Sequence, residues 1–151
     1  MNLIEVLTEA RTEVLDEATE RLGRSHLGHY DASGAEEQRH RLERLFDVVI
    51  ECLQHRDLAV VVAYAEKIAN DRFNNGFGID EVQTAFNVLE ESMWHQVADA
   101  VAPSELVESL GSLTTVLGVG KDALARSYVS LASRERVPSL DLRAMFRGTG
   151  G

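Results

Sequence analysis

The sequence is poor in the residues that interrupt helices or crosslink chains. Its 151 residues include two prolines and one cysteine, Cys52, and 6% are aromatic. A single cysteine excludes an intramolecular disulfide framework, and its apolar neighbours predict a small core residue rather than a nucleophile. There is no signal-peptide pattern, no apolar run near the roughly 20 residues that span a bilayer, and no convincing strand alternation. These absences predict an all-helical, cytoplasmic protein that does not act at a membrane.

Positive charge is also scarce. The chain has 25 Asp and Glu against 15 Lys and Arg, which gives a formal net charge of −10. Such a field repels phosphate backbones and anionic membrane surfaces, so we expect neither nucleic acid nor membrane as a partner. The densest basic stretch, residues 39–44, alternates with Glu36, Glu37 and Glu43. That pattern is typical of a solvated helix face with ion pairs.

Motifs for catalysis and for metal or haem binding are missing. There is no nucleophile elbow or metalloprotease helix, and residues 118–121 lack the spacing and preceding strand of a phosphate-binding loop. His26 and His29 have no second ligand pair at zinc spacing. His95, on an amphipathic helix, is predicted to face away from the apolar line, which argues against haem. We therefore expect no enzyme, no metal and no cofactor.

The most informative stretch runs from Arg72 to Val101. It contains an Asn-Asn-Gly-Phe-Gly turn, in which Gly76 and Gly78 can take positive φ and end a helix. Asp80 is the expected N-cap of the next helix, with Gln83 completing a capping box. Apolar residues then recur at spacings of three and four, on one predicted core face: Val82, Ala85, Phe86, Leu89, Met93, Val97 and Val101.

The remaining periodicity completes a bundle of about five helices, the last one long. The other four are expected at about residues 2–22, 35–55, 57–74 and 104–136, with an irregular connection over 24–34. The first has a narrow apolar line close to a heptad seam, so we regard it and the last helix as candidate dimer elements.

The last predicted helix carries three glycines, Gly111, Gly118 and Gly120. They either admit a close helix neighbour or kink the helix, and we expect one long helix. Val137 and Pro138 break the pattern beyond it. The sequence therefore predicts a single domain over residues 1–136 and a flexible tail over residues 137–151.

Several of these stretches together resemble a known family. They are His29-Tyr30-Asp31 through Gly34, Ala63-Tyr64-Ala65, residues 71–77 and residues 81–94. Over about residues 3–131 the chain resembles the N-terminal domain of RsbR and RsbRD-type co-antagonist proteins. The Arg-Phe-x-x-Gly turn, followed by a helix that ends in Trp, is the most specific part of the match.

The resemblance implies a globin-like helical bundle without haem that pairs as a dimer. It also implies a sensory or scaffolding input to bacterial stress signalling. No output domain follows in this sequence, so we expect a free-standing sensor or adaptor. The predicted function is a non-enzymatic, homodimeric signalling module that acts on another signalling protein. The alternative is a sensor that holds a small molecule or haem between its helices.

Five residues are candidates for ligand binding or interaction: Arg72, Asn87, Glu90, Glu91 and Trp94. Asn87 and Trp94 lie seven residues apart and therefore share a helix face, with the two glutamates between them, as at the edge of a polar pocket. The alternative is structural, and we favour it. In that case Trp94 is a packing anchor, the carboxylates are solvated or pair with Arg72, and Arg72 stabilises the turn.

Overall fold

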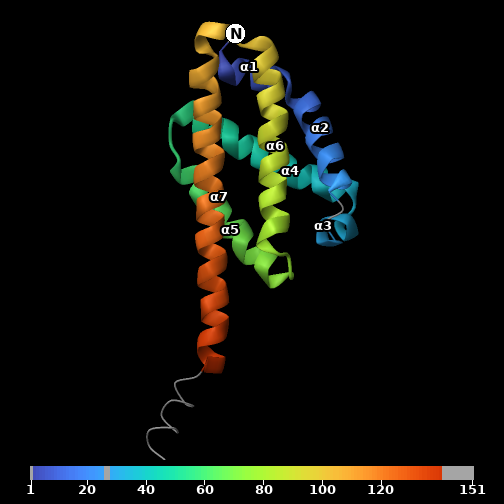
Figure 1. The fold of residues 1–151 in the computed structure, drawn as a ribbon, viewed down its shortest axis with the longest axis vertical. Coiled ribbons are helices and arrows are strands. Elements are labelled where there is room, and N and C mark those ends of the chain that lie inside the picture. Colours follow the sequence, from blue (N-terminus) through green and yellow to red (C-terminus); the bar gives the residue numbers. More distant parts are fainter. Residues whose placement is uncertain (1, 26–27, 141–151) are drawn as a thin grey trace, which may run out of the picture.

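The computed structural model describes residues 2–25 and 28–140, and every regular element in this part of the chain is a helix (Figure 1). The predicted all-α fold is therefore confirmed, with seven helices among the described residues. They are α1 (Leu3–Glu9), α2 (Arg11–Arg24), α3 (Gly28–Ser33), α4 (Ala35–His55), α5 (Ala59–Asn74), α6 (Ile79–Ala100) and α7 (Pro103–Leu140). None of these helices is long and apolar enough to cross a bilayer.

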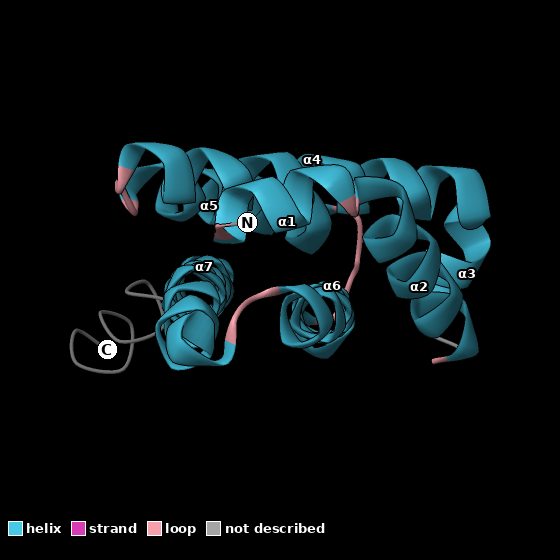
Figure 2. Ribbon diagram, turned by 90° about the horizontal axis from the view of Figure 1, so that it is seen from above, coloured by secondary structure: helices cyan, strands magenta, loops and turns pink. Residues whose placement is uncertain are grey.

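The helices form two layers. Seen from above, α1, α4 and α5 lie in one layer and α6 and α7 in the other, while α2 and α3 close the side next to α6 (Figure 2). α7 packs chiefly on α5 and α6, and α2 packs on α6 and α4. The core lies between the layers. Every residue of the apolar line predicted for the α6 segment is at most 8% exposed and belongs to this core.

The predicted first helix is divided in two. The backbone turns at Ala10, with φ −91° and ψ 12°, so α1 and α2 are separate helices. Hydrogen bonds continue across the break, from Ala10 N–H to the Val6 carbonyl at 3.0 Å and from Val14 N–H to the Ala10 carbonyl at 2.9 Å. The apolar period also runs through it, which is why a single helix was the wrong prediction. The expected irregular connection likewise contains a short helix, α3.

The long last helix is confirmed, and α7 is continuous across its three glycines. A Cβ at Gly120 would lie 2.9 Å from Val61 Cγ2 and 3.0 Å from Phe86 Cε2, so this glycine lets α5 and α6 approach closely. The helix end predicted at Arg136 is wrong, because α7 continues to Leu140. Pro138 falls in its last turn, where a missing N–H costs one intrahelical bond. Residues 141–151 of the predicted tail lie outside the described residues.

The start of α6 also differs from the prediction. Gly78, in an extended conformation, is the N-cap, and the Glu81 carboxylate accepts the Gly78 N–H at 3.3 Å. The predicted N-cap, Asp80, instead lies in the first turn, where its charge suits the positive end of the helix dipole. Only the Glu81 half of a capping box is therefore present, two residues before the predicted N-cap, because Gly78 has no side chain to supply the other half.

Candidate functional site

The turn between α5 and α6 is a complete Schellman motif. Gly76 takes φ +82° just after the C-cap, Asn75. The Phe77 N–H donates to the Arg72 carbonyl at 2.9 Å, and the Gly76 N–H donates to the Phe73 carbonyl at 3.1 Å. These bonds satisfy carbonyls that the end of a helix leaves unpaired. The predicted role of Gly76 is therefore confirmed, whereas Gly78 has negative φ.

Two aromatic contacts fix this turn to α7. The Tyr128 hydroxyl donates to the Phe77 carbonyl at 3.0 Å, and the Tyr128 ring meets the Phe73 ring edge-on at 5.7 Å between centroids. Phe77 and Tyr128 are each 8% exposed. The turn is therefore held by buried contacts with a helix that lies about 50 residues further along the chain.

Arg72 lies at the centre of this turn and is 8% exposed. Its guanidinium pairs with Asp71 on the same helix and lies 5.8 Å from the centre of the Phe77 ring. Its Nε is buried without a hydrogen-bond partner. The structural interpretation of the sequence expected Arg72 to stabilise this turn, and the arginine does lie there. Its carboxylate partner, however, is Asp71 and not a glutamate of α6.

Two of the predicted site residues on α6 share one partner. Lys121 of α7 donates to Asn87 Oδ1 at 3.0 Å and to Glu90 Oε1 at 3.2 Å. The Glu90 side chain is 12% exposed, so this ion pair is partly shielded from water. Lys121 lies more than 30 positions away in the sequence. No local signal could have identified it as a partner.

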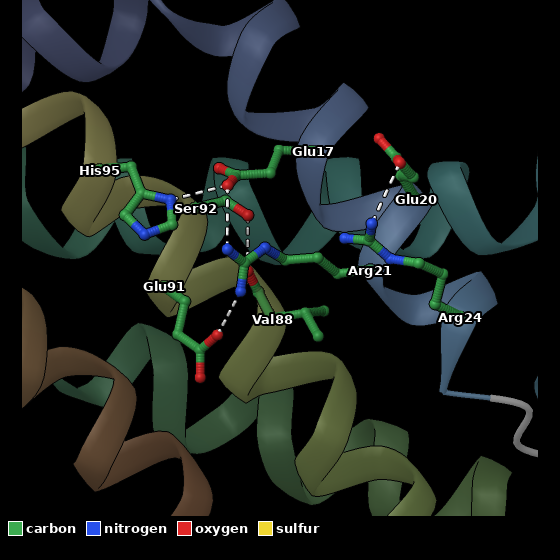
Figure 3. Close-up of polar contacts among 8 residues, drawn as sticks. All are labelled: Glu17, Glu20, Arg21, Arg24, Val88, Glu91, Ser92 and His95. Carbon is green, nitrogen blue, oxygen red and sulfur yellow. Dashed lines mark hydrogen bonds and ion pairs between the residues drawn. The ribbon is translucent and has the colours of Figure 1, made fainter.

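Glu91 points to a different helix and joins a polar network between α2 and α6 (Figure 3). Its carboxylate contacts Arg21 at 2.6 Å, and Arg21 also pairs with Glu17 at 3.2 Å. The same Glu17 oxygen lies 2.6 Å from His95 Nδ1. His95 is about half-exposed, which agrees with its prediction as a residue outside the core.

Trp94 completes the predicted set and is 39% exposed. Thus α6 brings Asn87 and Glu90 together through Lys121, turns Glu91 toward α2, and leaves Trp94 partly open to solvent. Arg72 lies apart from all four, in the last turn of α5. The five residues therefore do not converge on one pocket.

Two grooves lie elsewhere on the surface. The first, here the α1–α7 groove, has a volume of about 800 Å³ and is lined by residues that include Leu3, Cys52, Leu53, Leu58, Gly111 and Val116. The second, here the α4–α5 groove, has a volume of about 750 Å³ and includes Arg41, Arg44, Tyr64, Lys67, Arg72 and Phe77. Of the five predicted site residues, only Arg72 lines either groove.

Cys52 lies at the base of the α1–α7 groove but is 2% exposed, as expected of a core residue. Burial raises the pKa of the Cys52 thiol above its ordinary value, and nearby Asp57 and Glu51 add to the rise. A raised pKa keeps the thiol protonated and weakly nucleophilic at neutral pH. Among the described residues, no group of three His, Cys, Asp or Glu side chains is placed to hold a metal ion.

The comparison with known families supports the resemblance found in the sequence. No curated protein and no solved structure matches the chain. The model of one family, described as the RsbT co-antagonist protein rsbRD N-terminal domain, matches residues 5–145. The chain therefore belongs to this family of bacterial stress-signalling regulators.

Proposed function

We propose that the protein is a non-enzymatic signalling module that works as a homodimer and transmits its state to another signalling protein. The family supports the regulatory role. The observation that carries the dimer is the exposed outer face of α7. The same proposal places the protein in the cytoplasm, in keeping with its one buried, reduced thiol.

Two exposed valines, rather than a continuous apolar strip, mark the outer face of α7, which also carries the exposed Asp122 seven residues before the second of them. Val107 is 84% exposed and Val129 is 66% exposed. They lie about six helical turns apart and therefore on the same side of the helix. Between them on this side are small residues that would let a partner helix approach closely: Gly111, Thr114, Gly118 and Ala125. Figure 1 also shows the C-terminal part of α7 extending past the α5–α6 turn.

The other candidate dimer element is already occupied. Leu7 of α1 and Val14, Leu15, Ala18 and Leu22 of α2 are all 0% exposed, because they pack into the core of their own chain. Of the two elements proposed from the sequence, α7 is therefore the better dimer helix. Helices paired along such a face would carry a change in one chain directly to the other.

The solution mass tests this proposal. Light scattering on the purified protein at tens of micromolar is expected to give twice the chain mass. Val129→Asp places a charge on the proposed interface, so it is expected to give a monomer with the same helical content by circular dichroism. Ser130→Asp is the matched control, because it adds the same charge to an exposed neighbour about 100° around the helix.

A wild-type monomer at this concentration would overturn the dimer, and so would equal effects of Val129→Asp and Ser130→Asp.

The haem alternative is tested in the same samples by an absorption spectrum after expression with excess haem precursor. His95 is engaged with Glu17 at the surface, so we expect a colourless protein. A Soret band would overturn this expectation, and histidine variants would then locate the ligand.

A further inference from the structure

The α4–α5 groove is a basic site on an acidic protein. Four of its lining residues are cationic, Arg41, Arg44, Lys67 and Arg72, and two are acidic, Glu37 and Asp71. The groove therefore carries a surplus of two positive charges, whereas the whole chain has a net charge of −10. Such a local reversal attracts small anions that the rest of the surface repels.

Part of this positive charge is available to a ligand. Glu37 is paired with Arg41 at 3.4 Å, and Asp71 is paired with Arg72. Neither Arg44 on α4 nor Lys67 on α5 has a polar partner among the described residues. The two free cations therefore line the same groove from different helices.

The buried wall of the groove holds an unsatisfied donor. Arg72 is more than nine-tenths buried, and its Nε has no hydrogen-bond partner. Leaving such a donor unpaired costs about 1–3 kcal/mol, and more for a charged group. Arg72 also lines a small pocket of about 20 Å³, together with Gln38 and with Tyr64, which lines the groove as well. That volume has room for about one water molecule or one ligand atom.

The aromatic side chains of the groove hold its arginines in place. The Phe77 ring lies 5.2 Å from the Arg41 guanidinium and 5.8 Å from that of Arg72. Arginines held on an aromatic ring lose less conformational entropy when they bind an anion. Tyr64 and Ile68 add surface for an organic group, and a volume of about 750 Å³ is typical of small-molecule sites.

From these observations we propose that the α4–α5 groove binds a small organic phosphate. The phosphate dianion matches the surplus of two positive charges and is held by Arg44 and Lys67, beside the buried guanidinium of Arg72. The organic part lies against Tyr64 and Phe77. This inference deepens the proposed function and rests on it, because it names the class of ligand that such a signalling module would sense.

Phenyl phosphate is a suitable probe, because it joins a phosphate to an aromatic group. Isothermal titration at constant ionic strength compares it with inorganic phosphate and with benzoate, on the full chain. Phenyl phosphate is expected to bind most tightly. Lys67→Gln and Arg44→Gln are each expected to weaken it about three- to tenfold, as for the loss of a partly exposed charged contact.

Arg126→Gln is the matched control, because it removes the same charge from an exposed position of α7 outside the groove. It is expected to leave the affinity unchanged. Arg72→Gln disturbs the buried turn, so the two exposed cations carry the test. Circular dichroism confirms that each variant is folded.

Several results would overturn the proposal. They are the absence of saturable binding, equal weakening by Arg126→Gln, and inorganic phosphate or benzoate binding as tightly as phenyl phosphate. Tighter binding of a phosphoserine peptide would assign the groove to a partner protein instead.

Light scattering of the same samples separates the two proposals. A dimer that does not bind phenyl phosphate refutes the ligand alone, whereas a monomer refutes the proposed dimer whatever it binds.

Discussion

The two turns on either side of α5 end their preceding helices in similar backbone conformations but with different residues. After α5, Gly76 takes φ +82°, which costs a glycine little. After α4, Arg56 takes φ +51°, and its N–H donates to the Cys52 carbonyl. A side chain in this left-handed region costs about 1–2 kcal/mol. The α5–α6 turn is therefore relaxed, and the α4–α5 turn is strained.

The packing around the two turns differs as well. Phe77 after α5 is 8% exposed and is bonded to Tyr128, whereas Leu58 after α4 is 38% exposed. Each turn also lies beside a different groove. The α5–α6 turn borders the basic α4–α5 groove, and the α4–α5 turn borders the α1–α7 groove. The comparison shows that similar helix-ending geometries can differ in stability. The α5–α6 turn has a glycine and a buried aromatic residue, whereas the α4–α5 turn has a strained arginine and a partly exposed leucine.

Truncating the apolar residue of each turn tests the difference in packing. Phe77→Ala is expected to lower the free energy of unfolding by about 3 kcal/mol, since it empties a buried site. Leu58→Ala is expected to cost less than about 1 kcal/mol, because Leu58 is already partly in water. Urea unfolding at one protein concentration measures both, which keeps any dimer contribution constant. Equal losses would show that the two turns are packed alike.

Exchanging the backbone preference of each turn tests the difference in strain. Gly76→Ala is expected to cost about 1–2 kcal/mol. Arg56→Gly is expected to gain about 0.5–1 kcal/mol, because relief of strain exceeds the added entropy of the unfolded chain. Thermal melts followed by circular dichroism report both changes. Arg56→Ala is the control, since it removes the side chain but keeps the strain. If it stabilises as much as Arg56→Gly, the backbone is not the cause.

The smallest expected effect concerns Cys52 beside the strained turn, and it changes reactivity rather than stability. Burial raises the pKa of the thiol above its ordinary value, so less thiolate is present in the folded protein than in the unfolded chain at any pH near neutral. Alkylation by iodoacetamide is expected to be much slower in buffer than in urea and to accelerate as the pH rises. Equal rates in buffer and urea would show that the α1–α7 groove opens to the thiol.

Local patterns were sufficient to predict several features of the chain. The three-to-four spacing on α6 identified its core face, since side chains at these positions share one side of any α-helix. Gly76 identified the helix end, because few other residues adopt its backbone angle. The same reasoning was wrong at Ala10, where the apolar period and the hydrogen bonds run on through the bend.

The candidate site was harder to predict because its contacts are distant in the sequence. The grouping of Arg72, Asn87, Glu90, Glu91 and Trp94 assumed that neighbours on one helix act together. In the fold, Lys121 engages Asn87 and Glu90 while Arg21 engages Glu91. Each partner comes from another helix, so its position depends on packing rather than on spacing.

The sequence by itself determined the helical class, most helix positions, the core face of α6 and the family. These follow from short-range backbone preferences and from the periodic burial of apolar side chains. Only the tertiary structure decided which charges meet, that the first helix bends, and that four cations of α4 and α5 line one groove. The physical reason is that these features depend on how helices are placed against one another, and that placement is set by the packing of the whole core.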